Sequence, residues 1–462
     1  MTRDTTTKQL PPGKPGHPLV GNLLEAWRDP LHMLTESRRV YGPTVRFHFG
    51  PLRYVCIHRE ADIRHVLVQH RDNYPKSVNY RGLKLVLGEG LVTSEGETWR
   101  RQRKLAQPGF HHQSLVGFAA TMAECTAAML ERWDARDASE PFDVHDEMMR
   151  LTFRIVGRTL CSVDLDGVAA DMGQAITVAL HFAEDYAESA VRIPMWLPTP
   201  RNIRFRRALG RLDGLILGII EERRRSGETK GDLLDMLMRA TDETGTERMD
   251  DRQLRDELMT LVMAGHETTA VALSWAWYLL SKHPDVARAV QREARAVLGE
   301  RPATFRDLAD LRYTGRVIDE AMRLYPPVWI FERQAIAEDE IDGFRIPEKT
   351  IVGIPIWSLH RDPAHWDNPE GFDPDRFLPH RAEGRGKYAY MPFGGGPRIC
   401  IGNHFALMEA KIILAMVAAR YRLDLVPGHA IVPEPTITLR PKHGIHVLAR
   451  RQEACKEPAA AA

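Results

Sequence analysis

The sequence predicts a mainly helical protein with small β-sheets, folded as one large domain over residues 1–462. Most of the chain carries apolar residues at three-to-four-residue spacing, which is the period of an amphipathic helix. Alternation with period two is confined to short stretches beside Gly and Pro, which is typical of short strands. No linker divides the chain, although 462 residues exceed the usual length of one domain. We therefore expect a single folding unit.

The individual elements follow from these two periods. A β-hairpin is expected at Val45–Phe49 and Leu52–Ile57, and a further short β unit within Phe344–Val352. Helix breakers, notably at 194–200 and at His283-Pro284, separate several of the helical segments. The predicted helices are Glu97–Lys104, Phe118–Trp133, Met148–Leu160, Phe205–Arg225, Gln253–Ser281, Pro284–Leu298, Tyr313–Leu324 and Asn403–Tyr421.

Composition and charge exclude several classes of protein. Lys and Arg number 63 and Asp and Glu number 62, so the formal charge is +1. Such a balance offers no bulk attraction for a nucleic acid or an anionic membrane. Five cysteines, an odd number without a CxxC pair, argue against a disulfide framework or a zinc ribbon and favour a reducing compartment. They are Cys56, Cys125, Cys161, Cys400 and Cys455.

The N-terminal residues do not show the pattern expected of a signal peptide. The first residues lack the apolar core of a signal peptide, and the longest apolar stretches fall short of the ~20 residues that span a bilayer. Residues 1–17 are expected to form an N-terminal extension with a proline-rich, hinge-like segment, and residues 457–462 a disordered tail. The expectation is a cytoplasmic protein without an integral membrane anchor.

The most informative segment runs from Phe393 to Gly402 and contains three consecutive glycines before Cys400. Glycines allow a backbone to pass very close to a flat or bulky group. Cys400 precedes an apolar helix, and a helix N-terminus lowers the pKa of a thiol. Arg398 adds a permanent cation two residues away. A thiolate in this setting suits an iron ligand beneath a planar, anionic macrocycle.

This segment, FGGGPRICIG, resembles the haem-binding signature of the cytochrome P450 superfamily without a departure. The resemblance implies a cytochrome P450-like fold enclosing haem b, with Cys400 as the proximal iron ligand. Thiolate ligation pushes electron density onto the iron and favours O–O cleavage. Phe393, Arg398 and Gly402 are then cofactor-binding residues by the same motif.

A second motif lies inside the apolar helix at 253–281. Mid-helix Gly265 costs ~1 kcal/mol relative to Ala, and a buried Glu267 followed by Thr268 is unfavourable in a plain core helix. The segment resembles the family's oxygen-activation motif. The resemblance implies catalytic roles for Glu267 and Thr268 and places Ala264 and Gly265 beside the cofactor. A zinc-protease HExxH motif is excluded, because Ala270 stands where its second histidine is required.

Two further sets of residues fit the same family. Trp99 and Arg103 are four residues apart, so both lie on one face of the predicted helix. The planar guanidinium group of an arginine is well suited to binding a carboxylate. The resemblance implies that Trp99, Arg103, Arg333 and Arg398 contact the haem propionates. It also implies a structural ion-pair network, which holds the cysteine loop without doing chemistry. Its members are Glu320, Arg323 and Arg376.

By resemblance, the expected function is a haem-thiolate monooxygenase that inserts one oxygen atom from O2 into a mostly apolar small molecule, by hydroxylation or epoxidation. Substrate contacts are expected from variable loops within 77–92, 180–191, 328–330 and 436–439. Fatty acid, terpene, steroid and macrolide substrates stay open. Two alternatives also remain: a haem-thiolate isomerase or dehydratase that needs no external electrons, and a non-catalytic haem or ligand-binding protein.

The chain ends about 60 residues after Cys400, so electrons are expected from NAD(P)H through separate proteins, a ferredoxin or flavodoxin with its reductase. A soluble, bacterial-type monomer is the corresponding expectation. The docking patch predicted for this partner is basic, and an ordinary solvated face is the alternative interpretation. Its residues are Arg100, Lys104, Arg381, Arg385 and Lys387.

Overall fold

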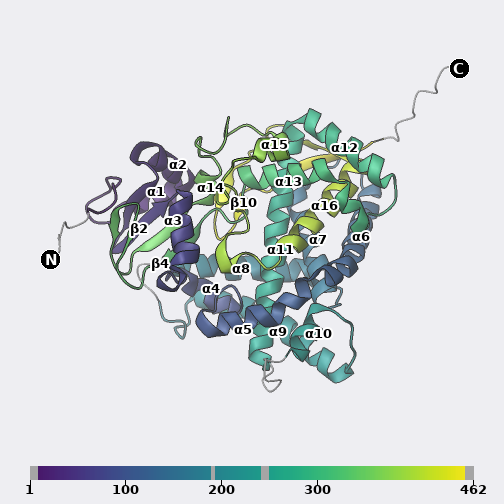
Figure 1. The fold of residues 1–462 in the computed structure, drawn as a ribbon. Helices are drawn as coiled ribbons and strands as arrows, with labels where there is room; N and C mark the ends of the chain where they lie inside the picture. The colour runs from purple at the N-terminus through teal and green to yellow at the C-terminus, as the bar shows by residue number, and fades with distance from the viewer. Residues whose placement is uncertain (1–8, 189–192, 241–248, 453–462) are drawn as a thin grey trace.

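The computed structural model describes residues 9–188, 193–240 and 249–452. Helix α11 (Asp251–Lys282) runs through the middle of the molecule, and other helices pack around it (Figure 1). Its 32 residues make it about 48 Å long at 1.5 Å per residue. The helix begins where it does because the Asp250 side chain accepts the backbone N–H of Gln253 at 2.7 Å. The prediction of a mainly helical domain with small sheets is confirmed.

All eight predicted helices are present. Several begin at a residue that local chemistry dictates: α9 starts at Pro200 because the Thr199 hydroxyl caps the N–H of Asn202 at 3.1 Å. The corresponding elements are α5 (Gly96–Ala106), α6 (His112–Asp134), α7 (Val144–Leu160), α9 (Pro200–Ser226), α11, α12 (Pro284–Leu298), α13 (Arg312–Leu324) and α16 (Asn403–Arg420).

Other helical elements were not predicted. Two of the expected substrate loops are corrected: residues 80–87 of the segment 77–92 are helical, and residues 180–188 are the last turns of a 20-residue helix, α8 (Ala169–Glu188). The others are α1 (Leu23–Arg28), α2 (Pro30–Tyr41), α3 (Glu60–Arg64), α4 (Tyr80–Leu87), α10 (Leu233–Arg239), α14 (Ile356–Leu359), α15 (Pro379–Ala382), the π-helical turn η1 (His65–Gln69) and the 3₁₀ turns η2 (Arg71–Asn73), η3 (Gln107–Phe110), η4 (Asp166–Val168), η5 (Phe305–Ala309), η6 (Pro374–Phe377) and η7 (Gly396–Arg398).

The largest sheet contains the predicted hairpin. Strands β1 (Thr44–Phe49) and β2 (Leu52–Ile57) pair antiparallel, and β2 continues in parallel with β7 (Ile351–Ile354), which pairs with β4 (Phe331–Gln334). The β unit predicted within 344–352 is two strands in two sheets, because the chain turns at Lys349, whose φ is +67°. The remaining strands are β5 (Asp339–Ile341), β6 (Phe344–Ile346), β3 (Phe142–Asp143), β11 (His446–Arg451), β8 (Tyr421–Leu425), β9 (Pro433–Pro435) and β10 (Leu439–Pro441).

The described part of the N-terminal extension is tied to the largest sheet. The N–H of Arg46 in β1 donates to the carbonyl of Pro12 at 2.8 Å, and the N–H of Lys14 donates back to Arg46 at 3.1 Å. The hinge-like segment is therefore ordered along β1. The tail predicted at 457–462 lies outside the described residues. None of the helices in the described ranges is both long enough and apolar enough to cross a membrane.

Two hydrophobic clusters share α11. Its residues between 254 and 263 pack with α8, α9 and α10, whereas those between 270 and 280 pack with α6, α7, α12, α13 and α16. Ala264, Gly265 and Thr268, between these two stretches, line a cavity instead. The break in the apolar pattern of α11 thus coincides with the part of the helix that lines the cavity.

Candidate active site

A cavity of about 1330 Å³ lies inside the fold. This volume exceeds the ~300–1,000 Å³ of a typical ligand pocket, so it leaves room for more than one bound molecule. Its lining includes all eleven residues predicted as catalytic or cofactor-binding. They are Trp99, Arg103, Ala264, Gly265, Glu267, Thr268, Arg333, Phe393, Arg398, Cys400 and Gly402.

Cys400 lies on a tight loop that leads into α16. Its N–H donates to the carbonyl of Phe393 at 3.0 Å, which closes the loop. Gly396 has φ +69°, and a Cβ there would lie 2.5 Å from the carbonyl oxygen of Leu67 in η1. Gly396 therefore serves the packing of the loop against η1, which differs from the interpretation that these glycines approach a bound group. At Gly402 a Cβ would meet no protein atom closer than 3.7 Å.

The electrostatics of Cys400 also differ from the expectation. Burial raises the pKa of the Cys400 thiol, while the N–H of Gly402 and the charge of Arg103 act in the opposite direction. The charge of a bound metal ion would act in the same direction as these two groups, because it favours the thiolate form of a coordinating cysteine. The cation that acts on the thiol is Arg103, since Arg398 forms an ion pair with Glu95 instead.

The cationic side chains in the cavity are positioned by backbone carbonyls and by rings. Arg103 donates to the carbonyl of Ile399 at 2.8 Å, next to Cys400. Arg398 donates to the carbonyl of Ser94 at 3.0 Å and lies 4.3 Å from the ring centroid of Trp99. The indole therefore orients Arg398 through a cation–π contact.

Sequence reasoning missed Lys76, which lines the same cavity. Burial, with repulsion from Arg398 and Arg333, lowers the pKa of Lys76 to about 6. Arg333 is itself buried and donates to the carbonyl of Glu332 at 2.8 Å. These cations repel one another, and an anion with two carboxylates relieves that repulsion. A thiol together with this set of cations fits an iron macrocycle that carries carboxylates.

On α11 the predicted acid–alcohol pair is not joined directly. The Thr268 hydroxyl donates to the carbonyl of Ala264 at 2.6 Å. Glu267 is buried and accepts the hydroxyl of Thr438 at 2.6 Å, from the turn between β9 and β10. No local pattern announces Thr438, because it lies 171 residues from Glu267 in the chain. A Cβ at Gly265 would lie 3.2 Å from Val156 in α7, so this glycine also permits close helix packing.

Apolar side chains line the rest of the cavity. The four segments expected to contact the substrate, 77–92, 180–191, 328–330 and 436–439, all contribute residues to the cavity lining. Residues 189–191 lie outside the described part of the chain. On α8 the contributors are spaced three or four residues apart, which places them on one helical face. The cavity also extends to α1, where Trp27 is 59% exposed. Contributors from the four segments are Leu83, Leu87, Leu91, Val92, Leu180, Ala183, Ala187, Val328, Trp329, Ile330 and Ile437.

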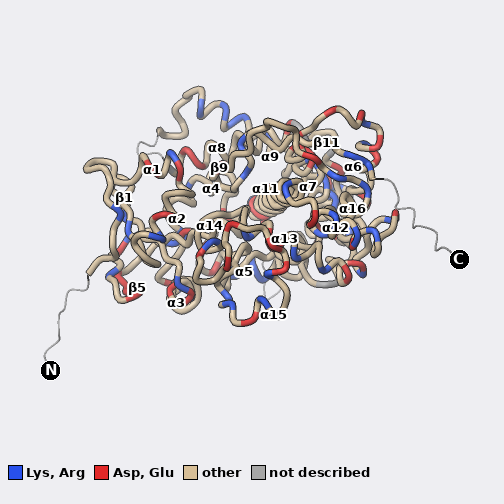
Figure 2. The backbone as a smooth tube through the Cα atoms, turned by 90° about the horizontal axis from the view of Figure 1, so that it is seen from above, with Lys and Arg blue, Asp and Glu red and all other residues tan. Residues whose placement is uncertain are grey.

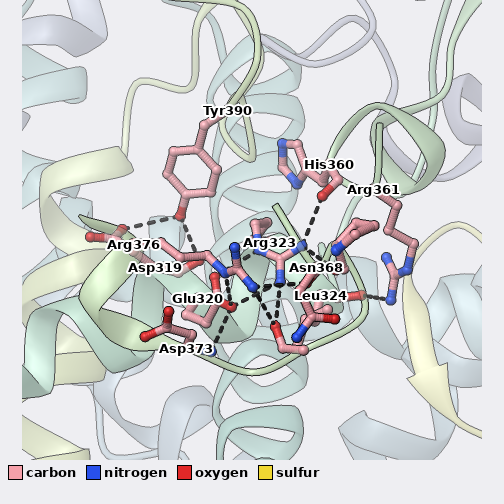
Figure 3. Close-up of polar contacts among 12 residues, drawn as sticks. Asp319, Glu320, Arg323, Leu324, His360, Arg361, Asn368, Asp373, Arg376 and Tyr390 are labelled. Atoms are coloured by element: carbon pink, nitrogen blue, oxygen red, sulfur yellow. Dashed lines mark hydrogen bonds and ion pairs between the residues drawn. The ribbon is translucent and has the colours of Figure 1, made fainter. Parts of the chain in front are cut away.

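Glu320, Arg323 and Arg376 meet in a buried ion-pair network (Figure 3). Arg323 donates to both carboxylate oxygens of Glu320, at 2.7 and 2.8 Å, and Arg376 donates to the same carboxylate at 3.2 Å. Arg323 also donates to the carbonyl of His360 at 2.9 Å. The network therefore ties α13 to the segment that precedes the cysteine loop.

His360 carries this link to the cysteine loop. Its Nε2 accepts the N–H of Met391, two residues before Phe393, at 3.0 Å. Burial, with the charges of Arg323 and Arg361, lowers the pKa of His360 to about 3, so the ring is neutral and Nε2 is free to accept. The three groups of the network thereby act on the position of the loop through one imidazole.

Comparison with known proteins agrees with this geometry. The family model "Cytochrome P450" matches residues 11–448. The chain is 39% identical to cyclooctatin synthase of Streptomyces melanosporofaciens (92% of each chain) and 37% identical to cyclooctat-9-en-7-ol 5-monooxygenase of the same organism (89% of each). It is 33% identical to pentalenene oxygenase of Streptomyces avermitilis, over 95% of this chain and 96% of that one. The chain therefore belongs to the cytochrome P450 family and is a cytochrome P450 monooxygenase.

Proposed function

We propose that this enzyme inserts one oxygen atom of O2 into a cyclic, apolar terpene-type hydrocarbon or its mono-alcohol. The observation that carries the proposal is the single cavity of about 1330 Å³, in which Cys400 and its cations share the lining with a large apolar surface. The relatives support the substrate class, since their names denote an unsaturated hydrocarbon and an unsaturated cyclic alcohol. A substrate without charge suits apolar walls, because a charged one would lose its hydration there.

The cofactor in this proposal is haem b, bound through the thiolate of Cys400. Arg103, Arg333, Arg398 and Lys76 are the partners proposed for its propionates, since all four line the cavity. Bound in this way, the iron supplies the activation of O2. The haem carboxylates would also draw the pKa of Lys76 upward again, because an adjacent anion favours the charged ammonium.

Glu267 and Thr268 are proposed to manage protons beside the cofactor. Thr268 Oγ1 carries a proton at the cavity wall, held by the carbonyl of Ala264 at 2.6 Å. Glu267 also lines the cavity, and Thr438 fixes one of its oxygens at 2.6 Å. Because the two groups share no hydrogen bond, a proton passes between them through an intervening water in this proposal.

Electrons are proposed to come from NAD(P)H through a separate ferredoxin or flavodoxin and its reductase. On α5, Trp99 and Arg103 are half-buried while Arg100 and Lys104 are exposed, which supports a docking strip on the outer face. Acidic neighbours reduce the charge of both parts of this surface: Arg100 pairs with Glu97, and Arg381 pairs with Asp373 at 2.8 Å. Arg385 lies 4.0 Å from the ring centroid of Trp366. Basic and acidic positions are interspersed throughout Figure 2, so the strip acts over a short range. A cytoplasmic monomer remains part of the proposal.

Turnover under labelled oxygen tests this function. The purified enzyme, a ferredoxin, its reductase and NADPH are incubated under ¹⁸O2 with pentalenene and, separately, with a fatty acid of similar carbon number. The proposal predicts a pentalenene product carrying one ¹⁸O atom and much slower turnover of the fatty acid. A product that forms without NADPH, or that lacks ¹⁸O, would instead indicate isomerisation or dehydration.

A further inference from the structure

A cluster of two histidines and one carboxylate lies outside the cavity. Nε2 of His65 lies 2.7 Å from Oδ2 of Asp339 in β5. The rings of His65 and His70 are stacked, with centroids 3.9 Å apart and planes at 14°. One possible ligand atom from each of the three residues lies within 4.8 Å of the others. Two imidazole nitrogens and a carboxylate oxygen thus lie close together.

The π-helical turn η1 is what brings the two histidines together. The N–H of His70 donates to the carbonyl of His65 at 2.8 Å, an i→i+5 bond. In an α-helix, residues five apart point about 140° away from each other, because each residue turns by about 100°. The wider π turn places them one above the other instead. Such turns are rare, and they occur frequently at functional sites.

The carboxylate of Asp339 is oriented before any ion binds. The hydroxyl of Tyr74 donates to Oδ2 at 2.8 Å, and the N–H of Glu340 donates to Oδ1 at 2.8 Å. Tyr74 is buried, so its ring is fixed by packing. Hydrogen bonds of this kind orient metal ligands in known sites. His70 is exposed, which leaves the cluster open to ions from solvent.

We propose that His65, His70 and Asp339 bind a divalent transition-metal ion of the Zn²⁺ class. Two imidazoles and one carboxylate are a common protein ligand set for Zn²⁺, with a water in the fourth position, whereas Mg²⁺ and Ca²⁺ prefer oxygen ligands alone. Zn²⁺ bonds of about 2.1 Å place tetrahedral ligand atoms roughly 3.4 Å apart. Binding therefore requires the ligand atoms, now within 4.8 Å of one another, to move closer together and the exposed ring of His70 to turn out of its stack on His65.

The site is mechanically connected to the cysteine loop. His65 and His70 bracket Leu67, whose carbonyl and side chain contact the positions of Gly396 and Gly395. An ion held by both histidines and by β5 fixes the ends of η1, the segment on which the loop packs. Binding is therefore expected to slow amide hydrogen exchange within 65–70 and, to a smaller extent, within 394–400.

Calorimetric titration of the purified haem-containing enzyme with ZnCl₂ tests the proposal. One equivalent of Zn²⁺ is expected to bind, MgCl₂ to give no comparable binding, and Tyr74→Phe to weaken the Zn²⁺ affinity about 10–100-fold. His70→Ala removes a ligand on an exposed side chain, so it should fold normally and lose at least as much affinity. His380→Ala, which removes another exposed histidine on α15, is the matched control and should bind like the parent.

Hydrogen exchange with and without Zn²⁺ localises the ion on the same samples. Protection that rises within 65–70 in the parent and in His380→Ala, but not in His70→Ala, supports the site. Unchanged Zn²⁺ affinity in His70→Ala, or protection confined to another part of the chain, would overturn it.

Discussion

Replacing Glu320 by Gln should destabilise the protein strongly, although the two side chains have nearly the same shape. Glu320 and Arg323 are fully buried, and Arg376 is 4% exposed. The carboxylate accepts four hydrogen bonds, from Arg323 twice, from Arg376 and from the N–H of Asp373. Without its charge, two guanidinium groups remain in the interior with only carbonyl partners. Removing one member of a buried ion pair costs about 3–5 kcal/mol.

This loss can be converted into a calorimetric shift. Unfolding entropy is about 2.1 cal/mol/K per residue, so 462 residues correspond to about 1 kcal/mol/K. Glu320→Gln should therefore lower the unfolding temperature by about 3–5 °C. The control is Glu338→Gln, because Glu338 pairs with Arg345 at 2.7 Å but both side chains are about half exposed. Its unfolding temperature should stay close to that of the parent.

Equal shifts for Glu320→Gln and Glu338→Gln would refute the reasoning, since the expected loss comes from burial of the charges and not from the mere presence of an ion pair. A second readout separates the loop from general stability. Because Arg323 reaches the loop through His360 and Met391, Glu320→Gln should also release haem faster to apomyoglobin. Haem release at the parent rate would mean that the network does not support the loop.

Three further changes address protons, electrons and pH. Thr268→Ala should retain haem but divert NADPH-derived electrons into hydrogen peroxide, measured as product formed per NADPH consumed. Charge reversal of Arg100 and Lys104 to Glu should slow the first electron transfer at low ionic strength and leave substrate-binding spectra unchanged. Burial raises the pKa of Asp319 to about 6, so the unfolding free energy of the parent falls as pH rises from about 4 to about 6. Asp319→Asn keeps an acceptor for the Tyr390 hydroxyl but carries no charge. Above pH 6 its unfolding free energy, measured by urea titration, should therefore exceed that of the parent by at most about 3 kcal/mol.

Each of these has a clear contradicting result. Unaltered coupling of product to NADPH in Thr268→Ala would remove that residue from proton delivery. Electron-transfer rates equal to the parent across a salt series would place the docking site away from α5. A stability difference between Asp319→Asn and the parent that does not change between pH 4 and pH 7 would show that Asp319 titrates normally in the folded protein.

The sequence allowed the long helices and the cysteine loop to be predicted, because both depend on local patterns. Apolar periodicity marked all eight of those helices, and the hairpin of β1 and β2 depends on neighbouring residues. The parallel pairing of β2 with β7 joins residues about 300 apart, for example Val55 with Val352, and no local signal specifies such a partner. The β unit expected within 344–352 is divided into two strands by the chain turn at Lys349, and the two strands join different sheets.

Site residues on motifs were predictable, whereas their partners were not. Cys400 and Thr268 could be named from the chain, and the structure places both on one cavity. Lys76 and Thr438 belong to no pattern, since they become important only through burial and through the fold that brings them to Arg398 and Glu267. The expected lowering of the Cys400 pKa took account of a helix terminus but not of desolvation, which is the largest influence on that thiol.

The identity of the iron ligand tests the account most directly. The reduced protein with carbon monoxide should show the long-wavelength Soret band that is typical of a thiolate-ligated haem. Cys400→His should lose this band while still binding haem, and Cys56→Ser, which removes a thiol buried in β2, should keep it. A thiolate-type spectrum that persists in Cys400→His would contradict the assignment of Cys400 as the ligand.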